Sequence, residues 1–78
     1  MERLLKALKL LNEFDNIMVV NGSSIMLVDN IIYWEHLKEV EFDYTNKNYK
    51  FDCSQINRIE LTGFAFIIIV NGDIVANY

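Results

Sequence analysis

Two Asn-Gly dipeptides, Asn21-Gly22 and Asn71-Gly72, constrain the fold of this chain most, because each lies between apolar, β-prone runs. A two-residue type I′ turn needs positive φ at both central positions, which Asn tolerates and Gly adopts freely, and this turn matches the twist of paired strands. We therefore predict an antiparallel hairpin at each dipeptide. The predicted strands are Ile17–Val20 with Ile25–Val28, and Phe64–Val70 with the last residues, Ile74–Tyr78.

A third hairpin is predicted from Val40 to Cys53, where apolar and polar residues alternate on both sides of the polar stretch Thr45–Asn48. A four-residue loop at Thr45–Asn48 pairs Tyr44 with Tyr49 and brings the apolar residues together on one face. A one-residue slip would turn every aromatic residue to the wrong side, which supports this choice of face. The remaining predicted pairs are Phe42 with Phe51, Val40 with Cys53, Asp43 with Lys50, and Glu41 with Asp52.

Residues 2–14 show the periodicity of an amphipathic helix. At 100° per residue, one face collects the apolar side chains and the opposite face most of the charged ones. Asp15-Asn16 is expected to end the helix, because Asn readily takes the left-handed conformation. The apolar face consists of Leu4, Ala7, Leu8 and Leu11, flanked by Leu5 and Phe14.

Two segments of the predicted sheet are less regular. Asp29-Asn30 interrupts the β-prone stretch from Ser24 to Trp34, either as a tight turn or as a bulge that bends one long strand; short flanking strands favour the bend. Phe64–Val70 is apolar throughout, which is typical of a strand covered on both faces. We expect it to be the central strand, with the helix over one of its faces.

These elements predict one domain over residues 1–78, in the α+β class. A helix at about 2–14 packs on a curved antiparallel sheet of five to seven strands, formed by a β-meander at about 17–78, and the curvature can close the sheet as a small barrel or roll. Its element order is similar to that of Sm-like RNA-binding barrels, but no Sm sequence motif is present. The chain lacks proline, so charged residues are expected to protect the sheet edges.

Charge and hydropathy exclude several classes of function. A formal net charge of −4 disfavours nucleic acid as a partner, because phosphate binding needs clustered Lys and Arg. The longest apolar run, Phe64–Val70, is far shorter than the roughly 20 residues that span a bilayer. Lys6 and Lys9 interrupt the stretch in which a signal peptide needs a continuous apolar segment. We therefore expect no membrane association and a cytoplasmic location.

The sequence offers little for catalysis or for metal binding. His36 is the only histidine and Cys53 the only cysteine, so multi-His metal sites and structural zinc sites cannot form. Cys53 falls on the apolar side of its hairpin, where a free cysteine behaves as a small hydrophobic residue. We expect a protein that is not an enzyme, without a cofactor or a metal.

The acidic row Glu39, Glu41 and Asp43 is the strongest candidate for a functional site. Same-face residues on a strand lie roughly 7 Å apart, close to the phosphate spacing along one DNA strand. Such a row can mimic a nucleic-acid backbone toward a basic protein, and Glu35 and Asp52 are candidates to extend it. The alternative is an ordinary solvated sheet face.

Exposed aromatic residues form a second candidate site, because Trp and Tyr carry much of the energy at interfaces. The candidates are Tyr33, Trp34, Tyr44 and Tyr49. In so small a domain such residues are also common in the core and its rim. A platform for single-stranded nucleic acid would need a basic groove beside them.

The leading hypothesis is therefore a small acidic protein-interaction module that binds a basic partner through the acidic row or self-associates through an edge strand. In size and charge it resembles phage-encoded anti-restriction and anti-CRISPR proteins, which implies an inhibitor of a nucleic-acid-binding protein. One alternative is a small-barrel domain that binds nucleic acid or another ligand through its aromatic residues. The other is a self-associating structural protein with no small-molecule ligand.

Overall fold

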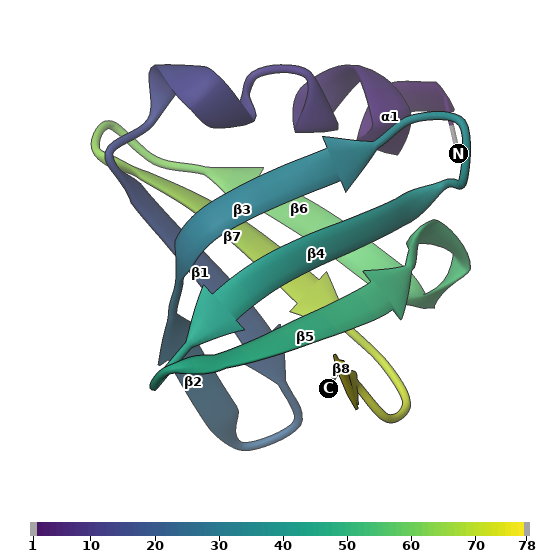
Figure 1. Ribbon diagram of the computed structural model, residues 1–78. Helices are drawn as coiled ribbons and strands as arrows, with labels where there is room; N and C mark the ends of the chain where they lie inside the picture. Colours follow the sequence, from purple (N-terminus) through teal and green to yellow (C-terminus); the bar gives the residue numbers. More distant parts are fainter. Residues whose placement is uncertain (1, 78) are drawn as a thin grey trace.

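The computed structural model describes residues 2–77 (Figure 1). Within this range the chain forms one α-helix, two short 3₁₀ segments and eight strands. The helical segments are α1 (Glu2–Leu8), η1 (Leu11–Glu13) and η2 (Cys53–Gln55). The strands are β1 (Asn16–Asn21), β2 (Ser24–Leu27), β3 (Asp29–Trp34), β4 (Glu39–Tyr44), β5 (Lys47–Asp52), β6 (Ile56–Leu61), β7 (Ala65–Val70) and β8 (Val75–Asn77).

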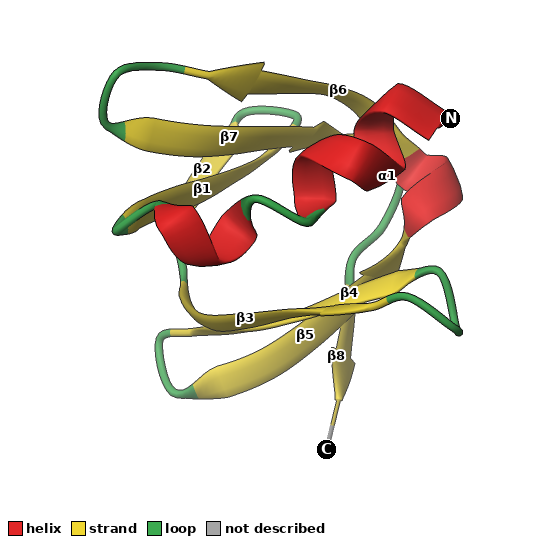
Figure 2. Cartoon of the chain, turned by 90° about the horizontal axis from the view of Figure 1, so that it is seen from above, coloured by secondary structure: helices red, strands yellow, loops and turns green. Residues whose placement is uncertain are grey.

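The strands form two sheets that face each other across the core (Figure 2). Sheet A has the order β2-β1-β7-β6 and sheet B the order β3-β4-β5-β8. All neighbours are antiparallel except β1 and β7, which run parallel. The α+β class is confirmed, and β7 is a central strand as predicted.

The expectation of one antiparallel sheet of five to seven strands is wrong. It assumes that consecutive strands pair, but the chain changes sheet at Val28, at η2 and at residues 71–74. The strand that follows each of these points therefore belongs to the other sheet and does not pair with the strand before it. No ladder joins sheet A to sheet B in residues 2–77, so the sheets do not close as a barrel.

The first predicted hairpin forms, but its turn lies one residue later than expected. Asn21 faces Ser24 at the end of the β1–β2 ladder, so Gly22 and Ser23 are the central residues. Gly22 has φ +60°, whereas Ser23 has a negative φ. Positive φ at the first central position alone is the pattern of a type II′ turn. The Asn21 side chain is left free to donate from Nδ2 to the Gly72 carbonyl, 2.6 Å away.

The hairpin predicted at Asn71-Gly72 does not form. Gly72 has the expected positive φ, +81°, but its loop carries the chain from sheet A to sheet B, where β8 pairs with β5. Gln55 holds this loop, because its Nε2 donates to the carbonyls of Asn71 at 3.1 Å and Asp73 at 2.9 Å. Tyr78, the last residue of the predicted strand, lies outside the described residues.

The Val40–Cys53 hairpin forms with the predicted faces and a different register. Thr45 and Asn46, with φ +50° and +65°, make a two-residue turn with positive φ at both positions, as in type I′. The pairing is therefore shifted by two residues from the predicted one, and a shift of two leaves every side chain on its face. The observed pairs are Tyr44 with Lys47, Asp43 with Asn48, Phe42 with Tyr49, Glu41 with Lys50, Val40 with Phe51, and Glu39 with Asp52.

Of the two interpretations of Asp29-Asn30, the structure supports the bend. The register between β3 and β4 shifts between Asp29 and Ile32, and Asn30 has φ +47°. The chain passes from β2 through the buried Val28 directly into β3, so the two strands belong to different sheets. A bend at this point moves the chain from one layer to the other.

The predicted helix is shorter than residues 2–14 and does not cover a sheet face. α1 ends at Leu8, where bonds from Lys9 N to Lys6 O and from Leu10 N to Ala7 O tighten the chain toward η1. α1 and η1 lie along the open side between the two sheets (Figure 2). The predicted apolar face is confirmed, since Leu8 and Leu11 are buried. No helix in residues 2–77 has the length and apolarity needed to cross a bilayer.

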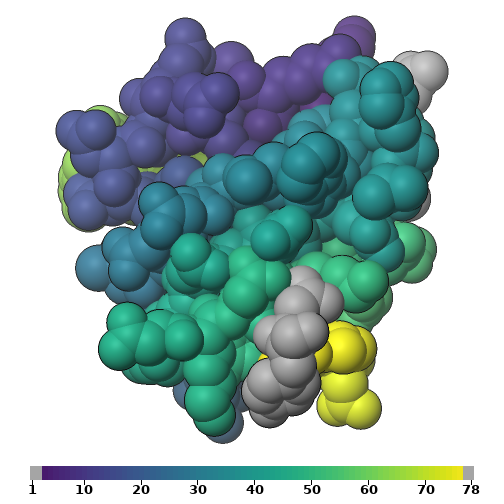
Figure 3. Space-filling model, viewed as in Figure 1, coloured from purple at the N-terminus to yellow at the C-terminus, as the bar shows by residue number. Residues whose placement is uncertain are grey.

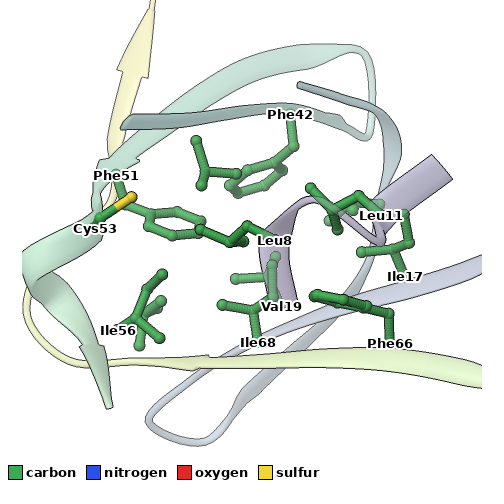
Figure 4. Packing of buried hydrophobic residues seen from close by; sticks show 13 residues of the cluster. Leu8, Leu11, Ile17, Val19, Phe42, Phe51, Cys53, Ile56, Phe66 and Ile68 are labelled. Carbon is green, nitrogen blue, oxygen red and sulfur yellow. The ribbon is translucent and has the colours of Figure 1, made fainter. Parts of the chain in front are cut away.

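The core fills the space between the inner faces of the two sheets and the helix (Figure 4). Phe42 and Phe66 are fully buried, one from each sheet, and Phe14 packs edge-on against Phe66 with ring centroids 5.5 Å apart. The buried cluster consists of Leu8, Leu11, Ile17, Val19, Val28, Val40, Phe42, Phe51, Cys53, Ile56, Phe66, Ile68 and Val70.

The sheet edges are protected by their geometry. β2 has four residues and β8 three, while β3 and β6 carry register shifts against their only neighbours. Short strands and bulges both hinder edge-to-edge pairing. The sequence suggested that charged residues alone protect the edges. In the structure, the edges are also protected by short strands and register shifts.

Candidate functional site

The predicted acidic row lies on the outer face of sheet B. Along β4, the buried Val40 and Phe42 alternate with the half-buried Glu39, Glu41 and Asp43, so the three carboxylates share the side that faces away from the core. Successive members are roughly 7 Å apart along the strand. Figure 3 shows the molecule from this side, with side chains of β3, β4 and β5 in teal and green.

Two carboxylates of the row are held in place by hydrogen bonds. The indole Nε1 of Trp34 donates to Glu41 Oε1 at 2.8 Å. Asp43 accepts from Asn48 Nδ2 at 2.8 Å and from Asn30 Nδ2 at 3.1 Å, and these bonds lower the pKa of Asp43 below its usual value. Both groups are therefore oriented before any partner arrives, which reduces the entropy lost on binding.

Asp52 and Lys50 lie on the same face, on the neighbouring strand β5. Asp52 faces Glu39 and accepts from the backbone N–H of Ser54 at 2.8 Å; hydrogen bonds from Ser54 lower its pKa. Lys50 faces Glu41 and reaches Glu39 at 4.0 Å. Four carboxylates and one ammonium group therefore share this part of the face, which is consistent with Asp52 as an extension of the row.

Glu35 does not extend the row. It follows β3 in the turn toward β4, and its carboxylate pairs with Lys9 at 3.4 Å, beside the helical side of the molecule. Glu35 is a candidate to extend the row in the sequence, but the turn at residues 35–38 breaks the alternation of the strand.

The four candidate aromatic residues are not brought to one face. Tyr33, Tyr44 and Tyr49 are half-buried and pack against the core, and Tyr49 stacks on Phe42 with ring centroids 5.5 Å apart. Trp34 alone points outward, with 45% of its surface exposed. Among residues 2–77, the four candidates therefore form no platform on which successive bases could stack.

Replacing Tyr33 with phenylalanine is expected to raise the free energy of unfolding by about 1 kcal/mol. The hydroxyl of Tyr33 is buried and has no hydrogen-bond partner among residues 2–77; burial, then Cys53 and Glu35, raise its pKa. Removing a buried, unpaired hydroxyl removes its desolvation cost. Urea denaturation of both proteins measures the change, and a loss of 1 kcal/mol or more would show that the hydroxyl is bonded in solution.

The sequence analysis missed two exposed apolar residues beside Trp34. Ile32, 45% exposed, lies on the same side of β3, and Leu37, 63% exposed, follows in the turn. A depression of about 440 Å³ is lined by Trp34, Leu37, Glu39, Glu41, Asn48 and Lys50. The alternation of Ile32 with Tyr33 could have placed Ile32, but Leu37 in a turn carries no such signal.

The structure does not assemble His36 and Cys53 into a reactive pair. Cys53 is buried, and its pKa is raised to about 11, chiefly by burial, so its thiol stays protonated at neutral pH. His36 is exposed in the turn at residues 35–38. In the described part of the chain, no group of three His, Cys, Asp or Glu residues is arranged to hold a metal ion.

Comparisons with protein-family models, curated proteins and solved structures give no match for this chain.

Proposed function

We propose that this protein is a non-enzymatic binding module that uses the outer face of sheet B to bind a basic surface of another protein. The observation that carries the proposal is the row Glu39, Glu41 and Asp43, with two of its carboxylates oriented by hydrogen bonds beside the exposed Trp34. Fixed carboxylates favour Lys and Arg through charge-assisted hydrogen bonds. Trp34, together with Ile32 and Leu37, supplies apolar area of the kind that dominates binding energy.

A basic, nucleic-acid-binding protein is the partner class that fits this face best. The same negative charge that attracts Lys and Arg repels phosphate. The roughly 7 Å spacing of the carboxylates suits a site that normally accepts a phosphate backbone. Binding then blocks that site, which makes the module an inhibitor. We place this activity in the cytoplasm, as the single unpaired cysteine suggests.

The charge of the row can be tested separately from its structure. In the variant E39Q/E41Q/D43N the amide oxygen at position 41 still accepts from Trp34, and the amide oxygen at position 43 keeps one of the two bonds from Asn30 and Asn48, while the three charges are gone. We expect its affinity for a partner captured from source lysate to fall by at least about tenfold. The loss of a charge that pairs across an interface lowers the binding free energy by kilocalories per mole, and about 1.4 kcal/mol corresponds to a tenfold change in affinity. The reversal E39K/E41K/D43K should abolish binding while its circular dichroism spectrum stays unchanged.

A matched control carries the same change in net charge elsewhere. Glu13, Asp15 and Asp73 are exposed and lie outside β3, β4 and β5, so E13K/D15K/D73K should bind within about twofold of the unmodified protein. Equal binding by E39K/E41K/D43K and the unmodified protein would overturn the proposal. Equal losses in the reversal and the control would mean that only overall charge matters.

A further inference from the structure

The outer face of sheet A is apolar and uncovered. Ladder partners point to the same side of a sheet, and the residues that alternate with the buried Val19, Phe66 and Ile68 all point away from the core. They form two rows across the four strands. One row is Leu27, Met18, Ile67 and Glu60, and the other is Ile25, Val20, Ile69 and Arg58.

Nothing in residues 2–77 packs over these rows. Leu27 and Ile25 at the β2 end are 60% and 66% exposed, and the side chains of β1 and β7 in both rows are only half-buried by their own neighbours. α1 lies along the open side between the sheets and not on this face (Figure 2). The expectation that Phe64–Val70 is covered on both faces is therefore not met within one copy of the chain.

The charges at the β6 end make the face self-complementary. Glu60 ends one row and Arg58 ends the other, and within one chain they form an exposed pair at 3.4 Å. A two-fold axis that runs across the strands, between the rows, exchanges the rows. It sets Arg58 of one copy opposite Glu60 of the other, and each apolar residue opposite an apolar residue of the other row.

We propose that two copies of this chain associate through the outer faces of their A sheets, about such an axis. Face-to-face packing of sheets about 10 Å apart is the ordinary geometry of β-sandwiches. The four edge strands are short or bulged, which favours the face over the edge pairing suggested by the sequence. The dimer is a four-layer stack with both B sheets on the outside.

The size of the face predicts a reversible dimer. Three strands of six residues and one of four, about 4.8 Å apart and with about 3.3 Å per residue, give a projected area of about 350 Å². This is within the range of 300–600 Å² of the largest apolar patches on monomers and below the ∼800 Å² that each partner contributes to a stable interface. We therefore expect a dissociation constant in the micromolar range.

Sedimentation velocity from about 1 to 500 µM tests the dimer. Ile67→Lys places a charge in the middle of the face and should leave a monomer at every concentration, with an unchanged circular dichroism spectrum. Ile32→Lys, on the outer face of sheet B, is the matched control and should dimerise like the unmodified chain. An unmodified chain that stays monomeric at 500 µM, or an Ile67→Lys variant that still dimerises, overturns the proposal.

The charge pair tests the direction of the axis. Arg58→Glu places glutamates opposite each other in both symmetry-related contacts at the β6 end of the interface and should weaken the dimer by about tenfold or more. The double variant R58E/E60R restores opposite charges in both copies and should recover the dimer. If Arg58→Glu has no effect, the axis does not run across the strands and the proposed arrangement is wrong. If the chain stays monomeric and an unrelated protein binds it only when Ile67 is intact, that protein and not a second copy of the chain occupies this face.

Discussion

Replacing Phe66 with alanine is expected to lower the free energy of unfolding by about 3–5 kcal/mol. Phe66 is fully buried in the central strand β7, between Ile17 of β1 and Leu61 of β6, and its ring contacts Phe14. Truncation removes the contact with Phe14, the residue that follows η1, and leaves a cavity. Since a chain of this length has a total stability of about 4–12 kcal/mol, the loss is a large share of it.

The neighbouring Phe64 provides a matched control for this substitution. It carries the same side chain two residues earlier, but 75% of it is exposed. Phe64→Ala should change the free energy of unfolding by less than about 0.5 kcal/mol. Urea denaturation followed by tryptophan fluorescence measures both variants. A cost below 1 kcal/mol for Phe66→Ala, or equal costs for the two variants, would contradict the described core.

Gln55→Ala is expected to cost about 2–3 kcal/mol, because one side chain connects three segments. Gln55 Oε1 accepts from Asp52 N at 3.0 Å, and Nε2 donates to the carbonyls of Asn71 and Asp73. These bonds connect the end of β5 to the loop between the two sheets. We expect the amide protons of β8 to lose protection in hydrogen exchange first, because β8 follows that loop.

The exposed Asn57 in β6 serves as the control for Gln55. Asn57→Ala removes an amide side chain two residues away and should change the free energy of unfolding by less than about 0.5 kcal/mol. If Gln55→Ala leaves the exchange rates of β8 unchanged, Gln55 does not hold the crossover loop.

The faces of the strands could be predicted from the sequence, whereas their partners could not. Alternation placed Val40 and Phe42 inside and Glu41 outside, because burial acts on each residue separately. Alternation does not distinguish a register from one shifted by two residues. The four-residue loop at Thr45–Asn48 and the observed two-residue turn are therefore equally compatible with the sequence pattern. Gly72 shows the same limit, since the dipeptide indicated positive φ without showing which strands the loop joins.

In the candidate site, too, the face of each strand residue could be predicted, whereas its hydrogen-bond partners could not. Glu39, Glu41 and Asp43 were predicted on one face and lie there. Glu35 is absent from that face, because the turn at residues 35–38 interrupts the alternation. Trp34 and Asn30 reach the row with their hydrogen bonds because β3 pairs with β4 and carries a bulge. Sequence periodicity reveals neither the pairing nor the bulge.

Trp34 permits the most direct test of the proposed function, because it is the only tryptophan and lies within the acidic face. Its fluorescence can be titrated with the captured basic partner, and in parallel with a single-stranded oligonucleotide, at two salt concentrations. Binding to the outer face of sheet B predicts a saturable change in Trp34 emission with the protein partner, weaker at high salt, and no change with the oligonucleotide. An emission that stays constant while the partner binds, or salt-sensitive quenching by the oligonucleotide, would contradict the account.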